Sequence, residues 1–488
     1  MVTDATLKGG GVTGKRRVVG ESARSRALIA VCFGTLLVTL DRAMVILALP
    51  TMGADIGPSN AARLIGIYLL VSGGLLIVGG RLSDVFGHRN VFVVAAMVFV
   101  SGSLACAMVS SPEFLALFRG IQALGGAVFT LGPTTLALSL HSEPANRARA
   151  LGFATTVSWL SQSAGPFLGA IVLMATPNWH WIFWVDIPIG LVLLVVSLVY
   201  LPSGNPAPYR ARESLVRSAV FAAGVLLCSY VISSWIEIHT KVGNLILLGG
   251  SGIAAVLLFL SMESVRPLLL ARFELPRGSR FRLASAAAAL MGCATYAAYL
   301  IYPTYLQLRV GYSPLQVATA MLPLTLLAAL LGLGFSARLV AYLGARWAAA
   351  AGLILIGSGL ALFSHSAGVG SLSLGMISSM ILVGGGFGIA PTALFVVAME
   401  GIAKVYAGVA SGLYVTAYVI GGGLGITILD AISSLLNRQS SLIGSETALA
   451  RSDSHQVISY IGAALAFAAA AITAVVLSPR YDDQEEVP

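Results

Sequence analysis

Residues 80–89 read GRLSDVFGHR, and residues 337–346 read ARLVAYLGAR. The Arg-Leu pair, the later glycine and the final arginine coincide at a constant offset of 257 residues. Each copy is short and basic, and each lies between two long apolar stretches. The repeat therefore predicts a chain built from two related halves, a common architecture of membrane transporters.

The composition around these two loops is that of a membrane protein. Of the 488 residues, 57% are apolar and 10% are charged, and the mean hydropathy is +0.90. A soluble domain carries about 25% charged residues, so the composition excludes an ordinary soluble enzyme and a disordered chain. A helix that crosses a membrane needs about 20 apolar residues.

Fourteen apolar segments approach or exceed that length. They lie at about 28–50, 62–80, 91–110, 114–138, 148–173, 180–201, 216–236, 243–262, 283–303, 315–340, 347–366, 371–395, 407–430 and 457–477. We therefore predict an all-α membrane protein with 14 transmembrane helices, in which two inserted helices separate two six-helix halves. The longest remaining loop, at about 431–456, is too short for a core of its own.

This prediction divides the chain into five parts. They are a basic tail over 1–27, an N-terminal half over 28–201, a linker with the two inserted helices over 202–282, a C-terminal half over 283–477 and an acidic tail over 478–488.

The distribution of positive charge predicts the orientation. The two tails and the loops on their side of the membrane carry 22 Lys and Arg residues, whereas the opposite loops carry 5. Cytoplasmic loops are enriched in Lys and Arg, so we expect both termini in the cytoplasm and the chain in the cytoplasmic membrane. The net charge of +9 then reflects topology and gives no reason to expect a nucleic-acid partner.

Three ionisable residues share one layer of the predicted membrane. Asp41, Arg119 and Asp186 each lie about 9 Å below the outer face, at a rise of 1.5 Å per residue. An ionisable side chain at such a depth is costly, which makes it a functional candidate. A nearby guanidinium favours the charged carboxylate, whereas burial favours the neutral acid. We predict that Asp41 binds a transported proton and that Arg119 tunes it, with a static ion pair as the structural alternative.

Asp186 joins this group on depth alone, and it could instead be hydrated at the outer mouth of the protein. Arg42 points about 100° away from Asp41 around the first helix. We therefore consider Arg42 as a partner for Asp186.

Six motifs occur in order along the chain. They are the loop 80–89; residues 40–50 in the first helix; Arg119, Gln122 and Gly125 in the fourth; Gly152, Gly165, Pro166 and Gly169 in the fifth; residues 179–190 at the start of the sixth; and residues 305–314 after the ninth. With these motifs the chain resembles the 14-helix drug:proton antiporters of the major facilitator superfamily over nearly its whole length.

The resemblance implies two structural roles. The first is a cytoplasmic latch formed by Gly80, Arg81, Asp84, Gly87 and Arg89, with Asp84 facing the helix that starts near Ala407. The second copy has Ala341 in place of Asp84, so we assign the latch to the first half alone. The second role is a sealed helix interface at the four fifth-helix residues, for which ordinary packing is the alternative.

Polar and aromatic residues at mid-membrane are candidates for the substrate cavity. They are Tyr68, Gln122, Tyr296, Tyr299, Tyr414 and Tyr418. Tyr302 and Tyr305 are expected to anchor the membrane interface instead, because they lie close to the end of the predicted ninth helix.

The sequence also departs from the family pattern. Ala43 and Leu47 stand where the family has Thr and Asn, Arg63 replaces a Trp, Asp186 replaces an Asn and Ser161 replaces a Gly. These changes leave the fold prediction intact but weaken the transfer of any particular substrate range.

The expected function is proton-coupled efflux of amphipathic compounds, hydrophobic or cationic, by alternating access. The alternatives are a dedicated exporter of one metabolite or self-made antibiotic, a proton-coupled importer and, remotely, a non-transporting membrane scaffold.

No enzyme activity, cofactor or metal is expected. Residues 9–15 match the start of a phosphate-binding loop, but Arg16 follows and no strand precedes. The expected partners are the small-molecule substrate, protons and the lipid bilayer, and a monomer is compatible with this reading.

The latch assignment generates a prediction. The variant Asp84→Ala should slow transport at saturating substrate and leave substrate affinity unchanged, because the loop lies away from the cavity. Binding and turnover measured separately in proteoliposomes check this. A large loss of affinity with normal turnover would contradict the latch role.

Overall fold

The computed structural model describes residues 21–140, 144–176, 178–201, 279–366, 372–402, 407–442 and 448–476. Within these ranges the chain is helical. The helices are α1 Glu21–Ile56, α2 Pro58–Phe86, α3 His88–Met108, α4 Pro112–Leu140, α5 Pro144–Ala175, α6 Trp181–Tyr200, α10 Ser279–Leu308, α11 Pro314–Ala320, α12 Leu322–Leu330, η3 Leu331–Phe335, α13 Ser336–Leu343, α14 Ala345–Ser366, α15 Leu374–Met399, α16 Ala407–Leu442, α17 Ala448–Ala471 and η4 Ile472–Val476.

Twelve of the described helical stretches are long and apolar enough to cross a membrane. Each of the twelve corresponds to one of the apolar segments predicted from the sequence. The two inserted helices, predicted at 216–236 and 243–262, lie outside the described residues, and the count of 14 therefore stays a prediction. The chain is a multi-pass membrane protein.

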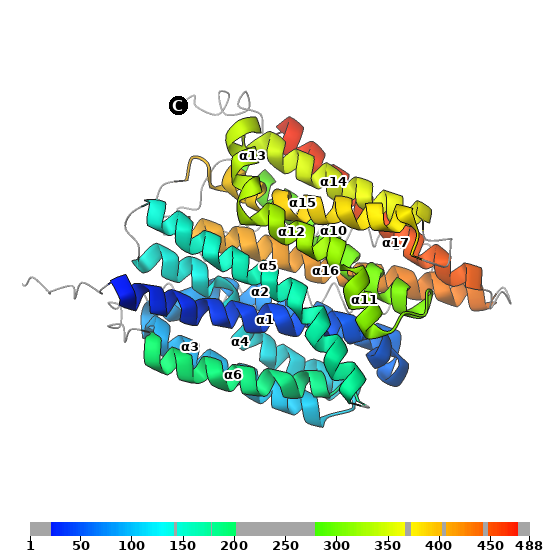
Figure 1. Ribbon diagram of the computed structural model, residues 1–488, viewed down its shortest axis with the longest axis horizontal. Coiled ribbons are helices and arrows are strands. Elements are labelled where there is room, and N and C mark those ends of the chain that lie inside the picture. Colours follow the sequence, from blue (N-terminus) through cyan, green and yellow to red (C-terminus); the bar gives the residue numbers. More distant parts are fainter. Residues whose placement is uncertain are drawn as a thin grey trace, which may run out of the picture.

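The helices form two groups that meet along two seams (Figure 1). Helices α1–α6 pack mainly among themselves, as do α10–α17. One seam joins α2 to α16, and the other joins α5 to α11 and α12. Each seam pairs the second helix of one predicted half with the fifth helix of the other. Helices α1 and α10, the first of each half, also touch at the centre.

Most of the loop predicted at 431–456 is helical. Helix α16 continues to Leu442, and α17 begins at Ala448. This expectation was wrong because hydropathy detects only the part of a helix that lies in lipid. A polar continuation such as Asn437-Arg438-Gln439 keeps its backbone hydrogen bonds inside the helix and is hydrated outside the membrane.

The repeated loops adopt the same backbone conformation. Gly87, which ends α2, has φ 83° and ψ 143°, and Gly344, which ends α13, has φ 81° and ψ 152°. Each glycine is followed at once by the next helix. A positive φ of this kind is costly for residues with a Cβ atom, which explains why glycine stands at the same place in both copies.

The helix that follows residue 313 is interrupted. The capping box of Ser313 and Gln316 starts α11, and α12 then runs into the π-helical segment η3. At Gly334 the backbone leaves the helical conformation, with φ 159° and ψ −22°. Its counterpart in the first half, α2, is continuous from Pro58 to Phe86.

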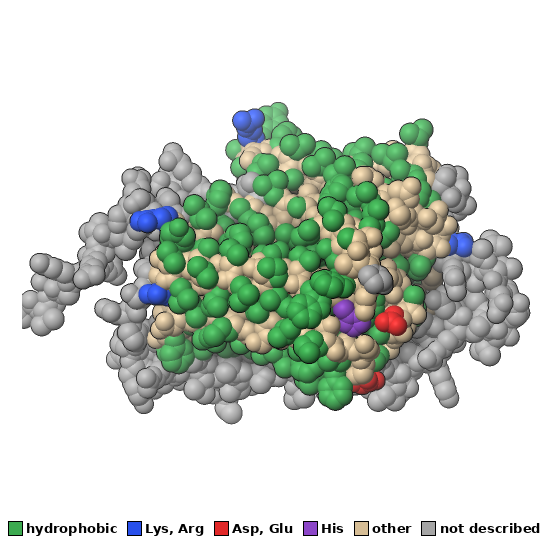
Figure 2. All heavy atoms as spheres, turned by 60° about the horizontal axis from the view of Figure 1, so that its bottom comes forward, with side chains coloured by type: hydrophobic (Ala, Val, Ile, Leu, Met, Phe, Trp, Pro, Cys, Tyr) green, Lys and Arg blue, Asp and Glu red, His purple; other side chains and the backbone are tan. Residues whose placement is uncertain are grey.

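The outer surface suits a lipid environment. In Figure 2 hydrophobic side chains cover the middle of the visible face, and the described charged side chains in view lie at its margins. Large apolar residues such as Met97, Ile171 and Val195 are exposed. A soluble monomer rarely exposes a continuous apolar surface of this extent, whereas lipid tails cover it without cost.

Glycines allow α5 to approach α1 closely. A Cβ atom at Gly165 would overlap that of Ala43 and lie 3.2 Å from the carbonyl oxygen of Leu40. At Gly169 it would lie 3.2 Å from the Cα atom of Met44. Small residues of this kind let helix backbones pack directly against each other in membranes. The backbones of α1 and α5 thus lie close together along this line.

This contact predicts a stability effect. Gly165→Ala should destabilise the protein by about 1–3 kcal/mol, because the added methyl group overpacks a backbone contact. The matched control is Gly120→Ala, whose new Cβ would have Ile67 as its nearest neighbour at 3.8 Å. Thermal unfolding in detergent should show a lower midpoint for Gly165→Ala and no loss for Gly120→Ala. Equal midpoints would contradict the close packing.

Candidate proton and substrate site

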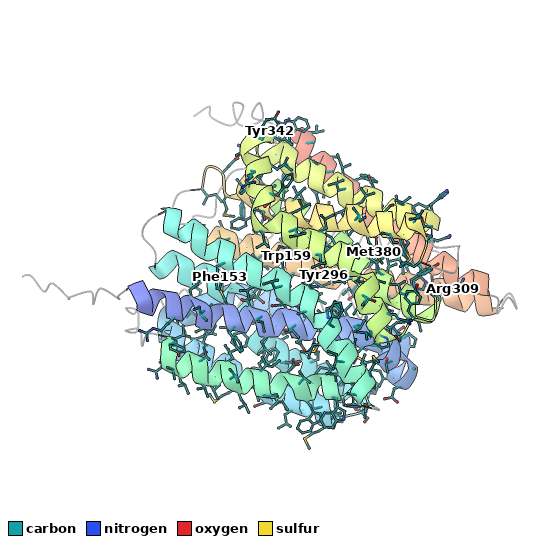
Figure 3. All side chains as sticks on the ribbon, viewed as in Figure 1. Phe153, Trp159, Tyr296, Arg309, Tyr342 and Met380 are labelled. Atoms are coloured by element: carbon teal, nitrogen blue, oxygen red, sulfur yellow. The ribbon has the colours of Figure 1, made fainter. Side chains whose placement is uncertain are left out.

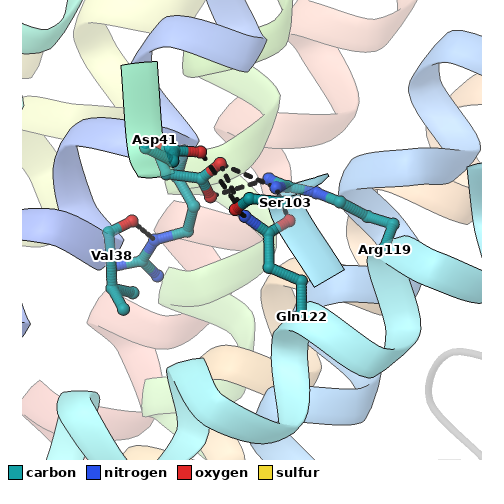
Figure 4. A network of polar contacts seen from close by, with 7 residues as sticks. Val38, Asp41, Ser103, Arg119 and Gln122 are labelled. Carbon is teal, nitrogen blue, oxygen red and sulfur yellow. Dashed lines mark hydrogen bonds and ion pairs between the residues drawn. The ribbon is translucent and has the colours of Figure 1, made fainter. Parts of the chain in front are cut away.

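A buried ion pair joins α1 to α4. Arg119 Nη1 donates to Asp41 Oδ1 at 2.7 Å, and Nη2 donates to Oδ2 at 2.9 Å. Both side chains are fully buried. This two-pronged geometry is the strongest arrangement available to arginine and a carboxylate. The structure thus brings together the two residues that the sequence analysis placed at one depth (Figure 4).

Gln122, one turn along α4, connects this pair to two further helices. Its Oε1 accepts from Arg119 Nη1 at 2.5 Å, and its Nε2 donates to Ser103 Oγ of α3 at 2.6 Å. The same Nε2 lies 3.5 Å from Asp41 Oδ1 and 3.4 Å from Asp186 Oδ2. Ser103 was not among the sequence candidates, and a serine inside an apolar helix gives little signal by itself.

Asp186 on α6 is the third member of the buried group. It is fully buried, so the alternative of a hydrated residue at the outer mouth is wrong. Its carboxyl group is a close neighbour of that of Asp41, since Gln122 Nε2 lies within hydrogen-bond range of both, and its Oδ1 has no hydrogen-bond partner. Two carboxyl groups close together in a dry site cannot both be ionised. Because Arg119 already binds both oxygens of Asp41, this geometry is suited to a proton held between the two acids.

Aromatic rings enclose the Arg119 guanidinium. Its Cζ lies 4.3 Å from the ring centroid of Tyr68 and 5.5 Å from that of Phe183. Stacking on a ring face stabilises a cation that has lost its water. Of the cavity candidates, Tyr68 and Gln122 therefore belong to the charged cluster.

Arg42 bonds to Tyr296 and not to Asp186, the partner considered from the sequence. Its Nη1 donates to the hydroxyl of Tyr296 on α10 at 3.1 Å, and its Nε donates to the Val38 carbonyl at 3.3 Å. The suggested pairing with Asp186 was therefore wrong. The physical reason is its direction: Arg42 leaves α1 toward the other half of the protein, whereas Asp186 faces α1 from within the first half.

Tyr296 belongs to an aromatic group between the halves. Its ring centroid lies 6.1 Å from that of Tyr299 and 6.4 Å from that of Tyr418. Figure 3 shows Tyr296 between the two groups of helices. Three of the predicted cavity tyrosines thus lie together.

A small apolar cavity lies beside this aromatic group. It has room for about one water molecule. Its lining residues are Ala43, Ile46, Leu47, Gln162, Pro166, Tyr299, Pro303, Met321 and Thr325. Helices α5 and α12 of one seam and the central helices α1 and α10 contribute to it. A drug-sized substrate requires about 300–1,000 Å³, so the halves must separate at this level to admit one.

The other tyrosines have packing roles. Tyr414 packs edge-on against Phe395 at 5.3 Å between ring centroids, one turn before Tyr418 on α16. Tyr302 and Tyr305 are fully buried, and Tyr302 forms a hydrogen bond of 2.5 Å with Ser379 of α15. The expectation that these two anchor the membrane interface was wrong, because α10 continues to Leu308 inside the bundle.

The latch candidates are only partly described. Gly80, Arg81, Gly87 and Arg89 flank the turn between α2 and α3, and Gly87 has the positive φ given above. The side chain of Asp84 and the segment before Ala407 lie outside the described parts of the chain. In the fifth helix, Gly165, Pro166 and Gly169 face α1 or the cavity, whereas the surroundings of Gly152 are likewise not described.

Among the described residues, no group of three or more His, Cys, Asp or Glu side chains could hold a metal ion. The buried cluster places two carboxyl groups beside one guanidinium, and the cavity presents mainly apolar and aromatic surfaces.

Comparison with known proteins identifies the class. The family model described as Major Facilitator Superfamily matches residues 31–426. The chain belongs to this superfamily of membrane transporters.

Its relatives include one protein named for export and two named for drug resistance. The cephamycin export protein CmcT of Amycolatopsis lactamdurans is 29% identical over 97% of this chain and 96% of its own length. The multidrug resistance protein Stp of Mycobacterium tuberculosis is 27% identical over 83% of this chain and 75% of its own. The puromycin resistance protein pur8 of Streptomyces alboniger is 28% identical over 83% of this chain and 81% of its own.

Solved structures share the fold. The human organic anion transporter MFSD10 (TETRAN) aligns with a TM-score of 0.60 at 16% identity, covering 92% of this chain and 99% of that chain. A crystal structure of the peptide transporter POT in complex with sulfate aligns with a TM-score of 0.61 at 15% identity, covering 93% and 95%.

The ion pair generates a stability prediction. Arg119→Gln should destabilise the protein by about 3–5 kcal/mol, because a buried carboxylate loses its counter-ion. The double variant Arg119→Gln with Asp41→Asn should recover much of this loss, since no unpaired charge then remains. Thermal unfolding of the wild type, both single variants and the double variant gives the coupling. Additive losses would show that the two side chains do not depend on each other.

Proposed function

We propose that this protein exports amphipathic, drug-like small molecules across the cytoplasmic membrane in exchange for protons, by alternating access. The observation that carries the proposal is the buried cluster of Asp41, Arg119 and Asp186 in a major facilitator fold. A proton held between the two acids, close to the boundary of the halves, is a means of coupling ion movement to their rearrangement.

The relatives support export as the direction and drug-like molecules as the cargo. Proteins named for multidrug resistance, puromycin resistance and cephamycin export align over most of this chain. The apolar cavity lining supports amphipathic cargo, because the positions where the family pattern has Thr and Asn carry Ala43 and Leu47, and both line the cavity. The same loss of polar side chains disfavours an importer of polar solutes.

The transport cycle follows from the geometry. Two seams, α2 with α16 and α5 with α11 and α12, close the space between the halves. Opening one side exposes the cluster to that side, and each proton that crosses a potential of 100 mV supplies about 2.3 kcal/mol. Such an energy supports roughly a fiftyfold gradient of substrate per proton. Both termini are cytoplasmic in this proposal, as the positive charge predicts.

A dedicated exporter of one antibiotic is the second candidate. The cephamycin export protein aligns along almost the entire length of both chains, whereas the multidrug relative aligns over 83% of this one. A susceptibility panel in a host that lacks its own pumps, with and without an uncoupler, separates the two. Resistance to many unrelated compounds supports the broad exporter, and resistance confined to one chemical class supports the dedicated one.

Neutralising Asp41 tests proton coupling. Asp41→Asn should abolish dye accumulation driven by an imposed pH gradient in everted membrane vesicles, since an amide keeps the shape but cannot release a proton. Dye binding to the purified variant should persist. The control is Asp55→Asn on the same helix, an exposed acid that accepts a hydrogen bond from Trp179, which should transport normally. Undiminished accumulation of the dye by Asp41→Asn, driven by the pH gradient, would contradict the proposal.

A further inference from the structure

Arg42 presents a second guanidinium at the boundary between the halves. It follows Asp41 directly in the sequence but leaves α1 on another side, at about 100° around the helix. Its hydrogen bonds go to the Val38 carbonyl of its own helix and to the Tyr296 hydroxyl of the opposite half. Figure 4 draws the bond at the Val38 carbonyl apart from the contacts of Asp41.

The charge of Arg42 has no carboxylate bound to it. Within the described residues, its hydrogen bonds reach only a carbonyl and a phenol. Both oxygens of Asp41 are occupied by Arg119, and Asp186 faces Asp41. Arg119 and Asp41 form one ion pair, so the guanidinium of Arg42 has no carboxylate as a hydrogen-bond partner, and Asp41 acts on it only through its electrostatic field.

Arg42 does not line the cavity itself. It is connected to the cavity wall through Tyr296, which accepts its hydrogen bond and whose ring centroid lies 6.1 Å from that of the lining residue Tyr299. The phenols of Tyr68 and Tyr418 are also close enough to Arg42 to interact electrostatically. A molecule that enters between the halves therefore meets an apolar wall, a group of aromatic rings and a guanidinium.

We propose that Arg42 makes this site selective against cations, so that the exported compounds are amphipaths without a positive charge. Like charges repel, and a cationic substrate would have to approach a guanidinium that no carboxylate binds directly. Uncharged and acidic molecules meet no such barrier, and a carboxylate could accept the hydrogen bonds of the guanidinium.

This inference rests on the proposed export function and narrows the class of compounds expected from the sequence, which included cationic ones.

A matched set of fluorescent probes tests the selectivity. Pyrene-butylamine, pyrene-butanol and pyrene-butyric acid share one skeleton and differ in charge. Their uncoupler-sensitive accumulation is measured in everted vesicles that contain the wild type, Arg42→Gln, Arg42→Lys or Arg309→Gln. The last variant is the control, because it removes the same charge from the loop after α10, far from Tyr296 (Figure 3).

The wild type should accumulate the alcohol or the acid at least about tenfold faster than the amine. Arg42→Gln should raise the ratio of amine to alcohol about tenfold, while Arg42→Lys and Arg309→Gln keep the wild-type ratio. A single charged hydrogen bond is of the size that produces such a change.

Two results would overturn the inference and leave the export function standing. One is wild-type transport of the amine at a rate within fivefold of the alcohol, which needs no variant to fold. The other is a folded Arg42→Gln protein whose ratio of amine to alcohol changes less than fivefold. If no probe accumulates in wild-type vesicles, the proposed export of amphipaths fails, and the selectivity of Arg42 fails with it.

Discussion

The ion pair between Asp41 and Arg119 is the constraint on which the first half depends. Two charges without water are stable only when bound to each other and to further polar groups. The structure satisfies this requirement with side chains from four helices: Asp41 from α1, Ser103 from α3, Arg119 and Gln122 from α4, and Asp186 from α6. Each of these helices must keep its rotation and height for the cluster to remain satisfied. The first half therefore behaves as one rigid unit around a polar centre.

The second half is held differently at the equivalent place. Its first and fourth helices, α10 and α15, are joined by the hydrogen bond between Tyr302 and Ser379. The ring of Tyr302 also packs edge-on against Phe363 of α14. The duplicated fold thus carries a charged connection in one half and a neutral aromatic one in the other. The buried charges come from α1, α4 and α6, whereas the aromatic group between the halves comes from α10 and α16.

The sequence predicted the helices well because the bilayer imposes a length and an apolar composition on each span. It also placed Asp41, Arg119 and Asp186 at one depth, since the rise along a helix is constant. Rotation around the helix axis is not determined in that way, so the partner of Arg42 and the burial of Tyr302 required the structure. Polar helix ends, such as residues 431–442 of α16, were missed because they lie where hydropathy gives no signal. The family motifs identified Gln122 as a candidate. Its depth alone does not reveal that it connects the ion pair to neighbouring helices.

The break at Gly334 has a mechanical consequence for the seams. Continuous α2 transmits a tilt applied at one end to the other end, as a rod does. The path from α12 through η3 to α13 bends at a glycine and lacks regular α-helical hydrogen bonding there. A force on the end of α13 is therefore absorbed locally before it reaches α12 and the seam with α5. The two seams are related by duplication but differ in stiffness. Rocking of one half against the other is therefore asymmetric.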